Sequence, residues 1–190
     1  MDNLLKEIRK CRVCTPHLPL GPNPVLAANS KSKICIIGHA PGKIVHHSGV
    51  PWEDKSGDRL RDWLGIGKDT FYNSSLFAII PMGFCYPGTG KTGDMPPRKE
   101  CAPLWHGALN KKMRGIELTL LIGQHAQSYY LTKIRKRNLT ETVKSYREYL
   151  PQYLPLPHPS PRNNIWMKKN PWFKDEVIPI LRDRISDLIF

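Results

Sequence analysis

The stretch Lys33-Ile34-Cys35-Ile36-Ile37-Gly38-His39-Ala40-Pro41-Gly42 decides the fold of this chain. Its short apolar run passes directly into a turn of Gly and Pro, a pattern that predicts a buried strand ending in a loop. Similar runs at Leu76 to Pro81, Leu118 to Ile122 and Tyr153 to Pro157 predict three further strands. The last of them closes in His158-Pro159-Ser160-Pro161, so two of the four strands are expected to end in loops that carry a histidine.

Helical patterns separate these strands. They comprise a helix from Asp2 with Leu4, Leu5 and Ile8 on one face, a helix opening at Ser56-Gly57-Asp58, a helix after Gly123, and a C-terminal helix from Trp172 to Ile189 that Pro179 kinks or shortens. This alternation predicts an α/β fold of three layers, with a four-stranded, mostly parallel central sheet flanked by helices. We expect one domain over residues 1–190, in which the Gly-, Pro- and Lys-rich stretch from Tyr86 to Arg98 is a loop.

The composition indicates a folded protein with a polyanionic partner. The 190 residues include 29 Lys and Arg against 16 Asp and Glu, a formal net charge of +13, while 40% hydrophobic residues and five Trp exclude a disordered polycation. Nucleic acid is the first candidate partner, because Lys and Arg release counterions when they neutralise phosphates. No apolar run approaches the ~18 residues of a membrane span, and Met1 to Arg12 lacks a signal-peptide core. We therefore expect a soluble, cytoplasmic monomer that has no contact with a membrane.

Four of the five cysteines have the spacing of a metal site, namely Cys11-x2-Cys14 and then Cys85 and Cys101 with fifteen residues between them. In a reducing cytosol such a set favours a metal site over a lone CxxC pair accompanied by two unrelated thiols. The CxxC turn presents two thiolates on one side of a loop, and the later pair completes four sulfur ligands, for which zinc and an iron–sulfur centre are both open. Cys35, inside the first apolar run, is interpreted as a small buried hydrophobe.

Both histidine-bearing loops resemble known sequence motifs. Gly38-His39-Ala40-Pro41-Gly42, followed by Gly49-Val50-Pro51-Trp52 and Ser56-Gly57, resembles the first motif of the uracil-DNA glycosylase superfamily, most closely that of its iron–sulfur branch, family 4. His158-Pro159-Ser160-Pro161 resembles the second motif of the superfamily. The four cysteines also match this branch, whose cluster is held by a CxxC pair and two later cysteines.

The resemblance implies a DNA repair glycosylase. Such an enzyme flips a uracil, or a related deaminated or damaged base, out of single- or double-stranded DNA and hydrolyses its N-glycosidic bond. It implies a 4Fe-4S cluster on the four cysteines, with zinc as the less favoured occupant. It assigns Trp52 to stacking on the base and His158 to stabilising the negative charge that develops on the O2 carbonyl of the base. The other expected substrate contacts are Gly38, Ala40, Pro41, Gly42, Ser160 and Arg162.

The sequence departs from the family 4 pattern at three positions. His39 replaces a Glu, Ala40 stands where other branches carry Asp or Asn, and Pro81 replaces an Asn that pairs with the uracil edge. Asp54, in a stretch similar to one in family 5, another iron–sulfur branch, is expected to position the attacking water, with His39 as the alternative. Asp54 would equally serve as the cap of the following helix. The hydrogen bonds that recognise the base then come from the backbone amides of residues 39–42, or the preferred base is not uracil.

Three functions compete at this stage. The first is an active monofunctional glycosylase, and the second is a catalytically reduced relative that binds nucleic acid without releasing a base, which the exchanges at His39 and Pro81 make credible. The third is an unrelated zinc protein with an α/β fold. The basic cluster Lys133-Ile134-Arg135-Lys136-Arg137 is either a solvated helix end or a phosphate contact.

Overall fold

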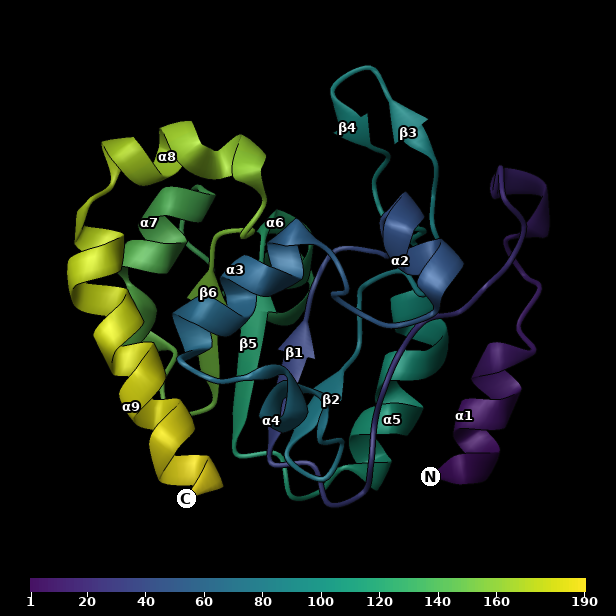
Figure 1. The fold of residues 1–190 in the computed structure, drawn as a ribbon, viewed down its shortest axis with the longest axis horizontal. Coiled ribbons are helices and arrows are strands. Elements are labelled where there is room, and N and C mark those ends of the chain that lie inside the picture. Colours follow the sequence, from purple (N-terminus) through teal and green to yellow (C-terminus); the bar gives the residue numbers. More distant parts are fainter.

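The centre of the molecule is a four-stranded sheet. In the computed structural model, which describes residues 1–190, the strands lie in the order β2-β1-β5-β6 and are all parallel. They are β1 (Ile34–Ile37), β2 (Phe77–Ile79), β5 (Leu118–Ile122) and β6 (Tyr153–Leu156). The predicted α/β fold around a four-stranded sheet is therefore confirmed. The carboxyl ends of the strands meet at the upper edge in Figure 1.

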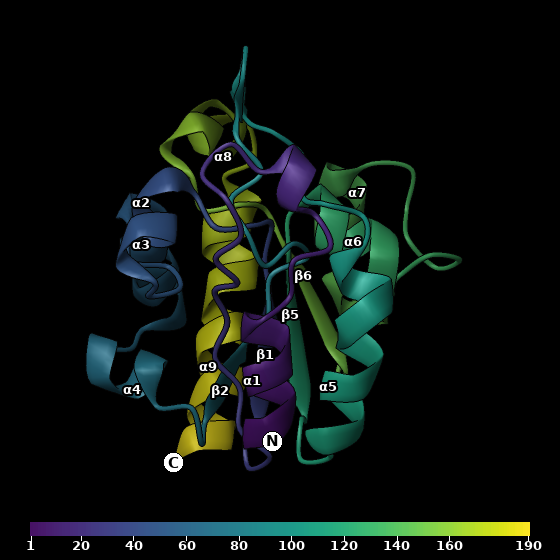
Figure 2. The ribbon, with the colours of Figure 1, turned by 90° about the vertical axis from the view of Figure 1, so that its right-hand side faces the viewer.

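Helices cover both faces of this sheet. Side chains alternate along β1, so Ile34 and Ile36 join one buried cluster and Cys35 and Ile37 join another. The first cluster is completed by α3 (Lys55–Leu64), α4 (Lys68–Tyr72) and α9 (Ile178–Ile189), and the second by α1 (Asp2–Arg9), α5 (Gly107–Lys112) and α6 (Gln124–Tyr130). Figure 2 shows α3 and α4 on one side of the strands and α5 and α6 on the other. Cys35 is buried in the second cluster, as expected of a small hydrophobe.

Shorter helical segments fill the connections. They are α2 (Lys43–Ser48), α7 (Leu139–Lys144), α8 (Asn164–Lys169), three turns of 3₁₀ helix (Thr15–His17, Tyr146–Glu148, Pro161–Asn163) and two π turns (Ala102–His106, Phe173–Val177). The predicted C-terminal helix is thus a π turn continued by α9, with Pro179 as the second residue of α9. Proline is tolerated there because the first turn of a helix has no internal partner for its N–H groups.

The stretch from Tyr86 to Arg98 is not only the loop that we expected. It contains the antiparallel hairpin of β3 (Thr89–Gly90) and β4 (Gly93–Asp94), in which Thr89 pairs with Asp94. The turn between them holds only Lys91 and Thr92, so the hairpin is short, and Figure 1 shows it projecting beyond the carboxyl edge of the sheet. Closely spaced Gly residues, which our prediction treated as loop composition, permit this tight reversal.

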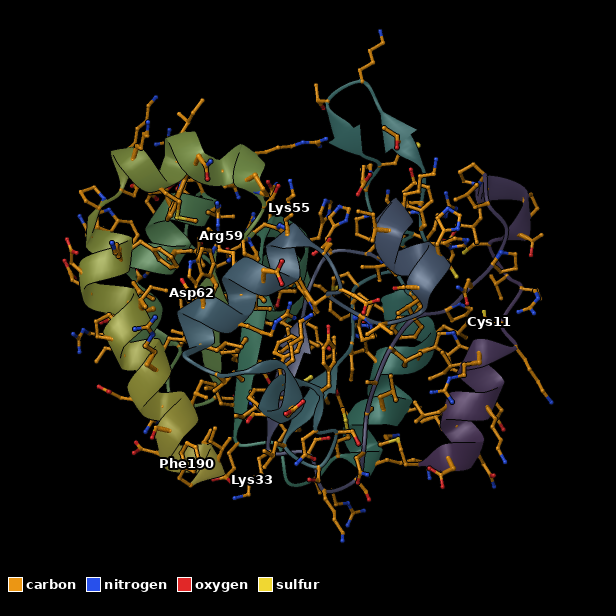
Figure 3. The ribbon with its side chains drawn as sticks, viewed as in Figure 1. Cys11, Lys33, Lys55, Arg59, Asp62 and Phe190 are labelled. Atoms are coloured by element: carbon orange, nitrogen blue, oxygen red, sulfur yellow. The ribbon has the colours of Figure 1, made fainter.

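The opposite edge of the sheet closes on the C-terminal helix. Lys33, just before β1, donates from Nζ to the Leu188 carbonyl oxygen over 2.9 Å. Figure 3 places Lys33 near Phe190 at the lower end of the molecule. None of the helices combines the length and apolar character that crossing a bilayer requires.

Candidate active site

A cavity of about 410 Å³ opens at the carboxyl ends of the strands. Its wall consists of the loop after β1, the turn before α3, the loop after β6 and part of the β3–β4 hairpin. It is lined by all ten residues for which the sequence predicts a catalytic or substrate-binding role, namely Gly38, His39, Ala40, Pro41, Gly42, Trp52, Asp54, His158, Ser160 and Arg162. The fold thus brings the two distant motifs to one site.

The loop after β1 offers free amide groups to this cavity. Gly83, in the segment after β2, donates its N–H to the carbonyl oxygen of His39 over 3.1 Å and so fixes the loop. The amides of His39, Ala40 and Gly42 donate to no backbone group of the protein. Because unpaired amides in a partly closed site cost free energy, they favour a ligand with carbonyl oxygens.

The indole of Trp52 forms one wall of the cavity. A Cβ atom on Gly38 would lie 2.7 Å from Cζ2 of this ring, so only glycine allows the ring to approach the loop. The imidazole of His158 lies beside the ring, with 5.5 Å between the centroids and 31° between the planes. A flat apolar surface next to a hydrogen-bonding imidazole suits a planar polar base.

The backbone of Trp52 is strained and is held by α3. Its φ of 60° lies in the left-handed region, which a bulky residue rarely adopts. Gly57 passes so close that a Cβ atom there would lie 1.7 Å from the Trp52 carbonyl oxygen. Arg61, buried under Phe71, donates to the same oxygen over 3.3 Å and pairs with Asp58 over 2.6 Å. Arg61 therefore positions Trp52. The sequence gave no sign of this role, because Arg61 stands among charged residues of α3 that usually face solvent.

His158 is a neutral hydrogen-bond donor in the cavity. Its Nδ1 accepts the N–H of Ser160 over 3.2 Å, so the proton of the neutral ring is on Nε2. Burial lowers the pKa of His158 to about 4, although the charge of Asp54 opposes this shift. Asn163 donates to the His158 carbonyl oxygen over 2.7 Å, and Arg59 to that of Ser160 over 3.2 Å. These bonds fix the loop and leave the Nε2 proton available to a ligand.

His39 is also neutral and is packed against a histidine that we did not predict. Its ring makes an edge contact with His125 of α6, with centroids 5.2 Å apart. Burial lowers the pKa of His39 to about 4, and repulsion from His125 and His158 adds to the effect. Neutral His39 has a lone pair that accepts a proton from water. His125 follows β5 and so lies at the carboxyl edge of the sheet. This position was the signal in the sequence that could have predicted its place in the site.

Two carboxylates face the cavity. Asp54 caps α3, since its Oδ1 accepts the N–H of Gly57 over 2.8 Å, yet it lines the cavity as well, so its capping role and its predicted role are compatible. Asp94, at the end of β4, was not predicted, because the sequence gives no reason for a residue of that stretch to face the motifs. Burial raises the pKa of Asp94, while Arg162 lowers it.

The basic cluster from Lys133 to Arg137 contributes nothing to this cavity. None of its residues lines it, and the segment lies between α6 and α7, where Figure 2 shows a projecting loop. Lys136 pairs with Glu148 over 2.6 Å, and Arg135 donates to Ser128 over 2.7 Å. These local contacts favour the interpretation of a solvated helix end.

The four cysteines with metal-site spacing meet at a second, smaller cavity. Cys11 and Cys14 follow α1, Cys85 follows β2, and Cys101 precedes the first π turn. All four thiols are free and line this cavity. Figure 3 marks Cys11 beyond the end of α1, at the edge of the molecule. Three separate segments therefore supply sulfur to one place.

The surroundings of these thiols fit a metal centre. Burial, together with the nearby thiols, raises the pKa of Cys85 to about 12, so a bound cation would be needed to hold it as thiolate at neutral pH. The Nε1 proton of Trp105, which lines the same cavity, is buried without an acceptor, as expected of a donor to a metal-bound sulfur. The structure contains no group of three or more His, Cys, Asp or Glu side chains already set as metal ligands.

A comparison with known protein families identifies the two motifs. A family model described as the Uracil DNA glycosylase superfamily matches residues 26–182. This range includes both loops of the cavity, as well as Cys85 and Cys101, and it begins after the CxxC pair.

We predict that Gly57→Ala lowers the free energy of unfolding by about 1–3 kcal/mol, because the new Cβ would overlap the Trp52 carbonyl group. Helix propensity alone predicts the opposite sign, since alanine is favoured over glycine within a helix such as α3. Urea unfolding measures the change. Gly107→Ala is the matched control, because Gly107 also lies in a helix and a Cβ atom there meets no atom within 4 Å, so we expect a gain of about 0.5–1 kcal/mol. A stabilised Gly57→Ala protein would contradict the assigned contact.

Proposed function

The chain belongs to the uracil DNA glycosylase superfamily, and we propose that it is a monofunctional DNA repair glycosylase that removes uracil or a related deaminated base. The family supports hydrolysis of an N-glycosidic bond in DNA as the general activity. The observation that carries the proposal is the placement of His158, a neutral donor, beside the Trp52 ring in one cavity. Its volume of about 410 Å³ is within the range of small-molecule sites.

The chemistry requires stabilisation of charge at two places. The bond between C1′ and the base nitrogen breaks with its electron pair going to the base, so negative charge collects on the base carbonyl O2 and positive charge on the sugar. His158 donates its Nε2 proton in a hydrogen bond to that oxygen and remains neutral before the step. Amides of the loop after β1 are further donors to the carbonyl groups of the base.

The sugar side needs a carboxylate and a water molecule. Asp54 keeps Oδ2 free while Oδ1 caps α3, so its negative charge offsets the positive charge on the sugar without loss of the cap. Water then adds to C1′ and gives up a proton, for which neutral His39 is an acceptor. With Asp54 offsetting the charge of the sugar and His39 accepting the proton of water, the replacement of the family's Glu by His39 is compatible with hydrolysis.

The four cysteines would hold a 4Fe-4S cluster, as in the family 4 branch, with Cys11, Cys14, Cys85 and Cys101 as thiolate ligands. Its chemistry here is structural, since it would tie α1 to the segment after β2 and to the first π turn. The sulfur atoms would draw together around it. DNA is the partner that fits the net charge of +13.

The test is incubation of the purified protein with oligonucleotides that carry one uracil, single-stranded or opposite guanine, followed by alkali and a denaturing gel. We expect cleavage at the uracil. We further expect His158→Ala to slow base release about 100- to 1000-fold with little effect on DNA affinity, because the lost bond strengthens only as charge develops. His47→Ala, an exposed histidine of α2, is the control. Tight binding of uracil-containing DNA without any release of base by the wild type would favour the binding-only alternative.

The pH dependence follows from the two neutral histidines. Because the pKa values of His39 and His158 are lowered to about 4, both rings stay neutral as the pH falls through 6.5, the usual value for histidine. We expect kcat/KM for base release to be level from about pH 8 to about pH 5.5 and to fall in more acid solution, where protonated His39 no longer accepts a proton. A midpoint near 6.5 that disappears in His39→Gln would contradict the buried, neutral state of His39.

Removal of one thiol should remove the cluster. We expect Cys85→Ser to lose bound iron and visible absorption and to melt at lower temperature, because the ligands join distant segments. Cys35→Ala is the control, since Cys35 is buried in β1. We expect the iron content of this variant to match that of the wild type. Iron and sulfide analysis with a thermal melt gives the result. A colourless wild type with one zinc would show that the four thiols hold zinc instead, and unchanged iron in Cys85→Ser would exclude the site.

A further inference from the structure

One carboxylate of the cavity has no part in the chemistry above. Asp94 reaches the cavity from β4, and its Oδ2 lies 3.4 Å from the point where a Cβ on Gly42 would be. The absence of a side chain at Gly42 therefore leaves room that Asp94 occupies. The three ion pairs of the protein do not include Asp94, although it lies near the cationic side chain of Arg162. Both of its side-chain oxygens are free to accept hydrogen bonds.

The position that reads the base in family 4 cannot do so here. Pro81 has no N–H, and its carbonyl oxygen accepts a hydrogen bond from Nε2 of His106 over 3.1 Å. His106 is neutral because burial lowers its pKa to about 4, and its Nδ1 accepts the hydroxyl proton of Tyr130 over 2.8 Å. This buried chain holds the Pro81 carbonyl in the core. A hydrogen-bond acceptor for the base must therefore come from elsewhere in the cavity.

Several other polar groups of the cavity hold its loops in place. Ser160 uses its hydroxyl oxygen to accept the N–H of Arg162 over 3.3 Å, and Asn163 donates its amide to the His158 carbonyl. One carboxylate oxygen of Asp54 caps α3. Asp94 is thus the one carboxylate lining the cavity with neither oxygen in a hydrogen bond.

The hairpin holds Asp94 against the second motif. Arg162, next to the His-Pro-Ser loop, donates from Nη1 to the Thr92 carbonyl oxygen at the hairpin turn over 3.0 Å. Gly93 lies between them, and a Cβ atom there would be 1.7 Å from the same Nη1. Arg162 thus holds the hairpin turn two residues before Asp94. Burial raises the pKa of Asp94, and the nearby charge of Arg162 opposes that shift and favours the charged form.

A charged carboxylate only accepts hydrogen bonds, so it selects a base edge that donates. Deamination supplies such an edge, since the ring nitrogen that is an unprotonated acceptor in cytosine and adenine becomes an N–H in uracil and hypoxanthine. A carboxylate at this edge attracts the deaminated base and repels the lone pair of its parent. Asp94 is exposed in the free protein, but a bound base would displace the water around it. A lone pair opposite the carboxylate would then leave it without a hydrogen-bond donor, which is more costly than losing one contact.

Resting on the proposed function, we propose that Asp94 is the residue that selects deaminated bases, by accepting a hydrogen bond from the ring N–H of the flipped base. The free amides of the loop after β1 then bind the carbonyl groups on either side of that N–H. The β3–β4 hairpin is accordingly a specificity element and not a surface loop.

The test measures binding in the His158→Ala background, where base release is suppressed. Three duplexes differ at one position, which carries uracil, N3-methyluracil or cytosine, and their affinities are compared by fluorescence anisotropy. We expect uracil to bind about 10- to 100-fold more tightly than either of the others, the range for a hydrogen bond to a charged group. Adding Asp94→Ala should reduce the preference over cytosine, which adds no bulk, by about 5-fold or more. The loop amides, which meet O4 in uracil but an amino group in cytosine, account for the preference that remains.

Two further variants separate the carboxylate from its support. Asp69→Ala, in α4 at the far end of the molecule in Figure 1, should leave the preference unchanged. Gly93→Ala keeps the carboxylate but displaces Arg162, and it should weaken the preference while the protein stays folded by circular dichroism. A preference for uracil over cytosine that Asp94→Ala leaves undiminished, or that the Asp94-containing protein lacks, overturns the proposal. The glycosylase assay on the wild type is independent of this ratio, so a failure of the proposed function would be seen separately.

Discussion

The close passage of Trp52 between Gly38 and Gly57 is the constraint on which the site depends. A Cβ atom at either glycine would collide with Trp52, at its ring in one case and at its carbonyl oxygen in the other. The buried Arg61 secures the same carbonyl oxygen, and the ring in turn lies beside His158. These contacts therefore fix the positions of the first motif, α3 and the second motif relative to one another. They are so close that there is no room for a larger side chain at either glycine. A strained backbone at Trp52 is sustained because so many neighbours determine it.

The electrostatics of the site are unusual for so basic a protein. With a net charge of +13, a cationic cavity would be the simplest way to bind DNA. Yet His39 and His158, which we propose to act in the reaction, are neutral, and two carboxylates face the cavity. Positive charge attracts the phosphates wherever it lies on the surface, whereas the reaction requires a negative environment for the sugar and neutral donors for the base. Burial separates these two demands, because it lowers the pKa of His39 and His158 inside the cavity.

The sequence predicted the sheet and the ten cavity residues because the information is local. Short apolar runs mark the strands, and loops that follow parallel strands must meet at one edge, so the residues of both motifs could be placed before the structure was known. Arg61, His125 and Asp94 escaped prediction for a different reason. Their roles depend on which side chain packs beneath a particular turn, and on a hairpin whose turn residues also suit an ordinary loop. The roles of all the cavity residues stay predictions until base release is measured.

The hairpin connects the two sites of the molecule. It lies within the segment between Cys85 and Cys101, so a group bound by these cysteines would fix both ends of the segment that carries Asp94. Arg162, which follows the loop of His158, donates a hydrogen bond to the turn of the hairpin. With its ends held by the thiols and its turn held by the second motif, the segment has few ways to move. A cluster bound there, as we propose, would thus influence base recognition without touching the base, through the placement of Asp94.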